Sequence, residues 1–178
     1  MPFLCYYISG DNMELPKRKS NRLKNYDYNT PAAYFITVCT RDRKNLFRDN
    51  VGATIGRPFE LSEYGKIVDT AIKNIPIKYS LIFVDKYIIM PNHIHLLLQI
   101  HSDKNGRAMP APTVSTVIQQ MKGYVTKQIG FPVWQKLFYD HIVRNESDYR
   151  EIWEYIENNP LKWAEDRFYS ECGFIRLK

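Results

Sequence analysis

The sequence has few cysteines and no long apolar run, and both absences narrow the kind of protein that it encodes. Its three cysteines, Cys5, Cys39 and Cys172, are odd in number and far apart, which argues against a disulfide framework and a cysteine-based zinc site. No stretch approaches the roughly 18 consecutive apolar residues of a membrane span. Residues 1–8 are apolar but too short for a secretion signal and lack its basic start. We therefore expect a cytoplasmic protein that does not enter a membrane.

The residues that are present indicate a globular domain that favours a polyanionic partner. The chain has 178 residues, of which 44% are hydrophobic and 25% charged, so a packed core is feasible. The formal net charge of +6 favours a partner such as nucleic acid. The aromatic content of 14%, with 13 tyrosines, suits base stacking as well as core packing.

The composition predicts one domain over residues 14–178. Residues 1–13 are expected to be dispensable, because Met13 is a second possible start. The domain divides into a basic N-terminal segment, a catalytic palm with its helix, and a C-terminal extension, which are residues 14–30, 31–130 and 131–178.

Basic side chains gather in two places where they are candidates for contacts with nucleic-acid phosphates. Such clusters are also common as ordinary solvated surface, and both interpretations are open. The candidates are Lys17, Arg18, Lys19 and Arg22 in the N-terminal segment, and Lys122 and Lys127 on a predicted helix.

The apolar pattern predicts an α+β domain. Strands are expected over residues 33–40, 81–90 and 93–100, and helices over 62–75, 113–129 and 147–157. Turn and linker segments are expected over 49–60 and 101–112. This order best matches the ferredoxin-like split βαβ arrangement, with a mainly antiparallel sheet whose first and third strands are central.

The tripeptide His93-Ile94-His95 lies in the third predicted strand. Alternation along a strand puts both imidazoles on one face and Ile94 on the other. Two imidazoles on one face can hold a divalent metal, whereas a hydrogen-bonded structural pair is the simpler alternative. A site of nitrogen and oxygen ligands without cysteine suits Mn²⁺, tolerates Mg²⁺ and argues against structural zinc.

Tyr124 and Gln128 lie one turn apart on the helix predicted over 113–129, on one flank of its apolar stripe. We expect them at the edge of the helix–sheet contact, with Tyr124 as a candidate nucleophile and Gln128 as a third metal ligand. A phenol has a pKa of about 10, so its attack on phosphorus needs help, which a divalent cation can supply. The product would be a phosphotyrosine, which keeps the energy of the cleaved bond for rejoining.

Three segments together resemble the single-tyrosine HUH transposases, and within them the REP-associated branch of the IS200-like elements. They are YIIMPNHIHLLLQI, MKGYVTKQIG and VWQKLFYDHIVRNESDYREIWEYIENNPLKW, within a likeness that spans residues 17–169. The resemblance implies a ferredoxin-like palm with His93 and His95 as metal ligands, Tyr124 as the nucleophile and Gln128 as the third ligand. Asn159-Pro160 also matches the family, with no role assigned beyond packing and turn formation.

The resemblance further implies a transposase that cleaves and rejoins single-stranded DNA near hairpin repeats. Cleavage in this family leaves a 5′-phosphotyrosine and a free 3′-OH, with Mg²⁺ or Mn²⁺ as the metal. The alternatives are a non-catalytic module that binds hairpin repeats, a rolling-circle initiator or relaxase, and a zinc–water hydrolase whose activity would survive Tyr124→Phe. Monomer and homodimer are both open.

Overall fold

The structure is a computed structural model that describes residues 32–48, 60–101, 113–163, 166, 168 and 169. Its elements, in chain order, are β1 (Ala32–Cys39), the 3₁₀ turn η1 (Arg41–Arg43), α1 (Glu63–Lys73), α2 (Ile75–Lys78), β2 (Ile82–Ile89), β3 (His93–Ile100), α3 (Val114–Ile129), β4 (Tyr139–Val143) and α4 (Glu146–Asn158). Residues 1–13, the basic segment 14–30 and most of the expected turn and linker segments lie outside the described residues, and Lys17, Arg18, Lys19 and Arg22 lie there too.

The four strands form one antiparallel sheet in the order β2-β3-β1-β4. The first and third strands are therefore central, as the sequence predicts, and the βαββαβ order is that of a split βαβ fold. Residues opposite one another in an antiparallel ladder share a face. On one such row, Thr37 in β1 pairs with His95 in β3 and with Tyr139 in β4.

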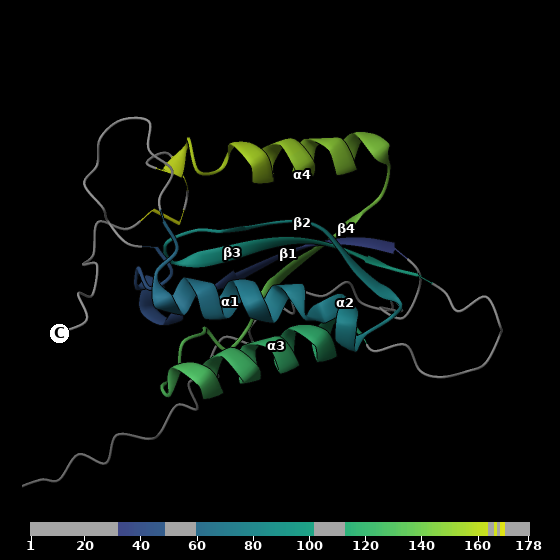
Figure 1. The fold of residues 1–178 in the computed structure, drawn as a ribbon. Helices are drawn as coiled ribbons and strands as arrows, with labels where there is room; N and C mark the ends of the chain where they lie inside the picture. The colour runs from purple at the N-terminus through teal and green to yellow at the C-terminus, as the bar shows by residue number, and fades with distance from the viewer. Residues whose placement is uncertain (1–31, 49–59, 102–112, 164–165, 167, 170–178) are drawn as a thin grey trace, which may run out of the picture.

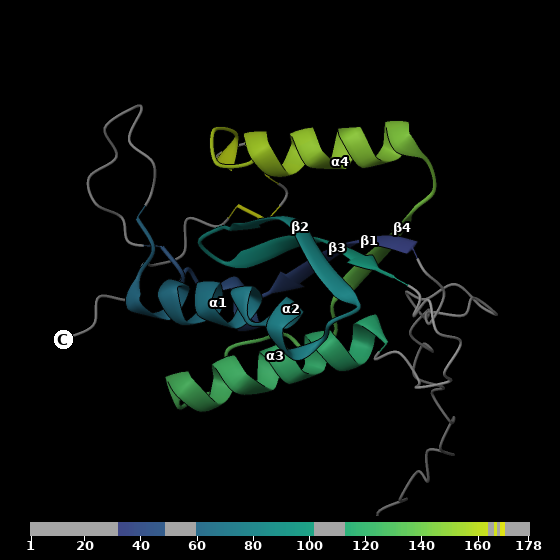
Figure 2. The ribbon, with the colours of Figure 1, turned by 45° about the vertical axis from the view of Figure 1, so that its right-hand side comes forward.

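The two faces of the sheet carry different helices, as Figures 1 and 2 show: α1, α2 and α3 lie on one side and α4 on the other. The main core lies on the first side, where the even-numbered residues of β3 meet the apolar stripes of α1 and α3. The members that define this contact are Ile94, Leu96, Leu98, Val68, Ile72, Val117, Ile118 and Val125, all of them buried.

Local capping explains where the helices on this face begin and end. The Ser62 hydroxyl accepts from the backbone N–H of Gly65 at 3.1 Å, and the Thr113 hydroxyl accepts from that of Thr116 at 3.2 Å. Gly130 closes α3 in a left-handed conformation with φ 88°. The sequence predicts that Pro76 ends the helical segment, but a short second helix, α2, includes it. A proline is tolerated there because it lies in the first turn, where its missing N–H would have no partner within the helix.

A much smaller cluster packs α4 against the opposite face. Phe35 of β1 and Leu97 of β3 meet Ile152 and Ile156 of α4. The Asn145 side chain caps this helix by accepting from the backbone N–H of Asp148 at 2.9 Å. None of the helices in the described ranges is long and apolar enough to cross a membrane.

Candidate active site

The two histidines point toward α4, on the face of β3 away from α1 and α3. Both side chains are 0% exposed, and the Phe168 ring lies 4.7 Å from the His93 ring and 6.1 Å from the His95 ring, centroid to centroid. Phe35 stacks on His95 at 5.1 Å. The predicted geometry, with both imidazoles on one face of one strand, is thus confirmed.

Each imidazole ring makes a hydrogen bond through its Nδ1 atom, and these two bonds orient the Nε2 atoms of His93 and His95 toward one another. The Asn92 amide nitrogen donates to the backbone oxygen of Phe168 at 2.8 Å, so its Oδ1 is the atom that faces His93 Nδ1 at 2.9 Å. His93 Nδ1 must therefore carry the proton, which leaves a lone pair on Nε2. His95 Nδ1 is 2.9 Å from the Thr37 hydroxyl, and the two Nε2 atoms are 3.0 Å apart. Rings fixed this way from behind are typical of metal-binding histidines.

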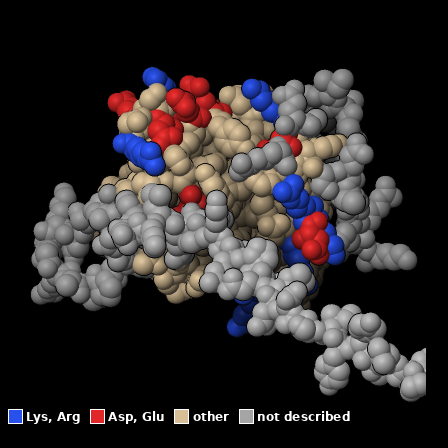
Figure 3. Space-filling view, turned by 180° about the vertical axis from the view of Figure 1, so that it is seen from behind, with Lys and Arg blue, Asp and Glu red and all other residues tan. Residues whose placement is uncertain are grey.

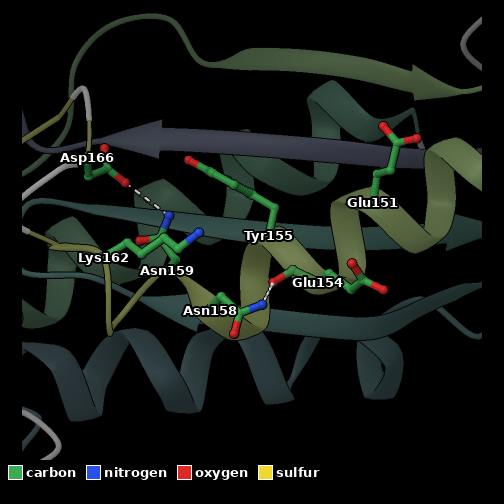
Figure 4. A pocket seen from close by; sticks show the side chains of 7 residues that line it. All are labelled: Glu151, Glu154, Tyr155, Asn158, Asn159, Lys162 and Asp166. Atoms are coloured by element: carbon green, nitrogen blue, oxygen red, sulfur yellow. Dashed lines mark hydrogen bonds between the residues drawn. The ribbon is translucent and has the colours of Figure 1, made fainter. Parts of the chain in front are cut away.

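Tyr155 of α4 brings a phenol to the same point. Its hydroxyl oxygen lies 3.3 Å from His95 Nε2, and its ring meets Phe35 edge to face at 5.9 Å. The side chain is 41% exposed, so one edge of the ring is open to solvent while the hydroxyl reaches the buried pair. Figure 4 shows the ring extending from α4 across the sheet toward Asn159 and Asp166.

Asn159 and Asp166 add two side chains with oxygen donor atoms to this cluster. The Asn159 amide nitrogen donates to Asp166 Oδ2 at 2.9 Å, the contact dashed in Figure 4. Asp166 Oδ2 lies 3.9 Å from His93 Nε2, and Asp166 Oδ1 accepts from the backbone N–H of Phe168 at 2.7 Å. Asn159 Oδ1 is buried without a hydrogen-bond partner among the described residues. An orphaned buried carbonyl oxygen costs free energy unless a further group satisfies it, and a hard cation is such a group.

These residues fit a divalent cation by the chemistry of their donors. His93, His95 and Asp166 each offer one ligand atom, all within 4.8 Å of one another. Two imidazole nitrogens with carboxylate and amide oxygens form the mixed set that suits Mn²⁺ and Mg²⁺ better than structural zinc.

A cavity of about 530 Å³ opens beside this cluster, and we call it the helix cavity. Its lining includes Glu151, Glu154 and Asp166 against one cation, Lys162. Figure 3, seen from behind, shows acidic side chains gathered at the top of the molecule, at the height of α4 in Figure 1. The helix α4 is therefore an acidic element, which repels nucleic acid along its own length.

Polar contacts hold α4 on the sheet. His141 Nε2 of β4 lies 2.9 Å from a carboxylate oxygen of Asp148. Burial alone would raise the pKa of Asp148, but hydrogen bonds from His141 and the backbone N–H of Arg144 outweigh it and lower that pKa below its usual range. Tyr149 donates to Asp85 at 2.8 Å, and burial together with this bond raises the pKa of Tyr149 to about 12.

The structure does not bring Tyr124 and Gln128 to the histidines, so the predicted placement of these two residues is wrong. α3 packs on the sheet face formed by Ile94 and Leu96, whereas the imidazoles point to the other face. Tyr124 is 43% exposed and lines a separate cavity of about 240 Å³ between α3 and the α1–α2 side. Gln128 is exposed one turn farther along.

The two predicted phosphate contacts on α3 differ in what their side chains do. Lys122 is half-buried and donates to the backbone oxygens of Gln135 and Lys136 at 2.6 and 3.2 Å. Burial also lowers the pKa of Lys122. Because its ammonium is already used to hold the segment before β4, Lys122 is a structural cation in this fold. Lys127 is exposed on the same helix, across the sheet from the histidines.

Sequence reasoning missed Tyr155, Asn159 and Asp166 as members of one site. The pair Tyr155 and Asn159 has the same spacing as Tyr124 and Gln128, a tyrosine followed by a carboxamide one turn later. The sequence contains both pairs. Choosing between them requires knowing which helix covers the sheet face that carries His93 and His95.

The chain is similar in sequence to bacterial proteins. No protein-family model matches the chain. A Haemophilus influenzae protein of unassigned function is 33% identical over 177 residues, covering 89% of this chain and 96% of its own length. A second H. influenzae protein, provisionally named a REP-associated tyrosine transposase, is 22% identical over 150 residues, covering 79% of this chain and 77% of its own.

Among solved structures, that of a REP-associated tyrosine transposase bound to a REP hairpin matches with a TM-score of 0.58 and 22% identity. The match covers 81% of this chain and 74% of the other, and it shows that the two share a fold. Both the named relative and this structural neighbour are transposases. This chain is therefore similar, in sequence and in fold, to the REP-associated tyrosine transposases.

Proposed function

We propose that this protein cleaves and rejoins single-stranded DNA beside hairpin repeats, with Tyr155 rather than Tyr124 as the nucleophile. One observation carries the proposal: the Tyr155 hydroxyl lies 3.3 Å from His95 Nε2, at the point where two buried imidazoles converge. The hairpin substrate is supported by the related transposase whose structure was solved with a REP hairpin.

The reaction follows from what a phenol can do next to that cluster. As Tyr155 Oη forms a bond to phosphorus, the bond from phosphorus to the 3′-oxygen of the leaving strand breaks. The phenol loses its proton, and the 3′-oxygen gains one to become a free hydroxyl. The enzyme keeps the 5′-phosphate as a phosphotyrosine, so attack by a new 3′-hydroxyl in the reverse direction rejoins strands without further energy.

The residues that would hold a divalent cation are His93 and His95 through Nε2, Asn159 through Oδ1 and Asp166 through its carboxylate. Bound Mg²⁺ or Mn²⁺ would supply charge that offsets the negative charge developing on the phosphate oxygens. Asp166 also orients Asn159: because it accepts from the amide nitrogen, the amide oxygen faces away from Asp166 and has no hydrogen-bond partner within the described part of the chain.

The test is a covalent-adduct assay with matched tyrosine variants. Purified protein is mixed with labelled single-stranded DNA from the flanks of its own gene, with Mn²⁺ or Mg²⁺, and run on a denaturing gel. We expect a metal-dependent adduct that disappears in Tyr155→Phe and persists in Tyr124→Phe, whose tyrosine is equally exposed. An adduct that survives Tyr155→Phe would refute the assignment, and binding without any adduct would favour the non-catalytic repeat-binding protein.

A further inference from the structure

A second cavity lies on the other side of the histidines from the helix cavity, where the sheet ends at β4. It measures about 400 Å³ and we call it the edge cavity. Its lining comes from β1, the turn η1, the segment that leads into β4, and Phe168: Thr37, Cys39, Arg43, Gln135, Leu137, Phe138, Tyr139 and Phe168.

The edge cavity is continuous with the site through a row of side chains across the sheet. Thr37 pairs with His95 on one side and Tyr139 on the other, so all three point to the same face. Two strand spacings separate Tyr139 from His95, roughly 10 Å at the backbone. Phe168 belongs to both places, because it lines the edge cavity and its ring contacts both imidazoles.

The chemistry of the edge cavity is opposite to that of the helix cavity. Among the residues that the structure describes, the helix cavity is lined by three carboxylates and one cation, whereas the edge cavity is lined by Arg43 and by no carboxylate. Tyr139 and Phe168 offer aromatic surfaces, and the Gln135 amide and Thr37 hydroxyl offer hydrogen-bonding groups. A cation, aromatic faces and a few polar groups are what binding of single-stranded nucleic acid requires.

The backbone that carries Arg43 is fixed beside the site. Arg43 has a left-handed backbone with φ 54°, and its carbonyl oxygen accepts from the Asn92 amide at 3.3 Å. The same amide also holds Phe168, and Asn92 Oδ1 faces His93. The Arg43 guanidinium lies 5.5 Å over the Phe168 ring. Strained backbone outside glycine is concentrated at functional sites, and here the turn presents a cation next to the histidines.

We propose that the edge cavity binds one nucleotide of the single strand next to the cleaved phosphate, with its base against Tyr139 and its phosphate at Arg43. The identity of the ligand rests on the proposed function. If a DNA strand lies across the histidines, the nucleotide next to the phosphate held there lies at this cavity. The acidic lining of the helix cavity directs the strand to this side.

The test measures binding without cleavage, in full-length protein with chelator and no metal. The probe is an oligonucleotide that contains the flanking hairpin, with 2-aminopurine placed in turn at each unpaired position beside it. We expect strong quenching at one position, caused by stacking on Tyr139. Tyr139→Ala should remove this quenching and raise the Kd about 5- to 150-fold, the range for loss of one base–aromatic stack.

Tyr124→Ala is the matched control, because Tyr124 and Tyr139 are each 43% exposed and lie on opposite sides of the sheet. It should leave both readouts unchanged, and Tyr139→Trp should keep the quenching. Arg43→Gln should lower the slope of log Kd against log salt by about 0.7, the value for one phosphate contact on a single strand. Thermal unfolding of each variant verifies that it folds.

The outcomes separate this proposal from the proposed function. If wild-type protein forms the adduct but Tyr139→Ala binds like Tyr124→Ala, the edge cavity is not a nucleotide site and the catalytic assignment stands. If no adduct forms but Tyr139→Ala weakens binding, the cavity binds a nucleotide in a protein that does not cut. Absence of quenching at every position overturns the proposal directly.

Discussion

The two faces of the sheet differ in the chemical character of their side chains. The face toward α1 and α3 is almost entirely aliphatic, and it forms the main core. The face toward α4 has two buried histidines, a buried threonine and a small apolar cluster of four buried residues. Burying apolar area stabilises the fold by about 25 cal/mol per Å², whereas burying imidazoles stabilises it only when their nitrogens are paired.

The difference shows how one sheet separates stability from chemistry. The α1–α3 face supplies most of the apolar burial that stabilises the fold. The other face can therefore hold buried polar groups whose arrangement favours ligand binding, even though it contributes less to the stability of the fold. The orphaned Asn159 Oδ1 lies on that second face. Three experiments test this division, each directed at one face.

The largest effect on stability is expected from Ile118→Ala in the main core. Ile118 is 0% exposed, and truncating a buried isoleucine to alanine costs about 2–5 kcal/mol of the free energy of unfolding. The Kd of the folded protein for Mn²⁺ should stay as in wild type, because no ligand lies on that face. Urea unfolding and Mn²⁺ titration measure the two quantities. The comparison fails if Ile118→Ala weakens Mn²⁺ binding as much as stability.

A smaller effect, confined to the α4 face, is expected from the oxygen ligands. Asn159→Ala and Asp166→Asn should each raise the Kd for Mn²⁺ by at least about 10- to 100-fold, the loss typical of an outer-shell partner, because each residue is itself a proposed ligand. Asn158→Ala is the control, since that side chain is exposed and donates only to the Glu154 carbonyl of its own helix among the contacts described. Isothermal titration calorimetry gives the affinities. Equal Kd values in all three variants would remove Asn159 and Asp166 from the cation site.

The smallest effect concerns how α4 is held at low pH. The pKa of Asp148 is lower in the folded protein than in the unfolded chain. Its contribution is therefore complete above the unfolded pKa of about 4 and is lost as the pH falls through the lower folded value. Asp148→Asn should lower neutral-pH stability by under about 1 kcal/mol, the scale of an exposed pair, and flatten the acid limb of a melting curve against pH. An unchanged acid limb would show that this pair does not hold α4.

Much of this architecture could be predicted from the sequence, for identifiable physical reasons. β1 and β2 are rich in β-branched and aromatic residues, and β3 is a short apolar run bounded by turn signals; the prediction for each strand lies within one residue of its observed ends. α1 and α3 have clear apolar stripes and capping residues. β4 was not predicted because its five residues, YDHIV, place Asp140 and His141 in the middle of a short strand.

The proposed nucleophile, Tyr155, could not be chosen over Tyr124 from helix periodicity alone. The stripe on α3 shows which side of the helix meets a sheet, but not which face of the sheet it meets. Connection rules supply the missing step, since crossover helices of this topology share a face. The more aliphatic face of β3 is the one that such helices cover, so His93 and His95 had to face something later in the chain. α4, with Tyr155, is that element.

The separate packing of α4 also bears on how such a protein changes over generations. The helix α4, which carries the proposed nucleophile, is held by the small cluster around Phe35 and Leu97 and by a few polar pairs, apart from the main core. Substitutions in α4 are therefore expected to lower the stability of the fold less than substitutions in α1 or α3, and selection for stability acts on them more weakly. If the proposed roles hold, a lineage that loses strand cutting through changes in α4 still inherits an intact palm with its edge cavity. The proposed cutting and binding would then be separately heritable traits of one small domain.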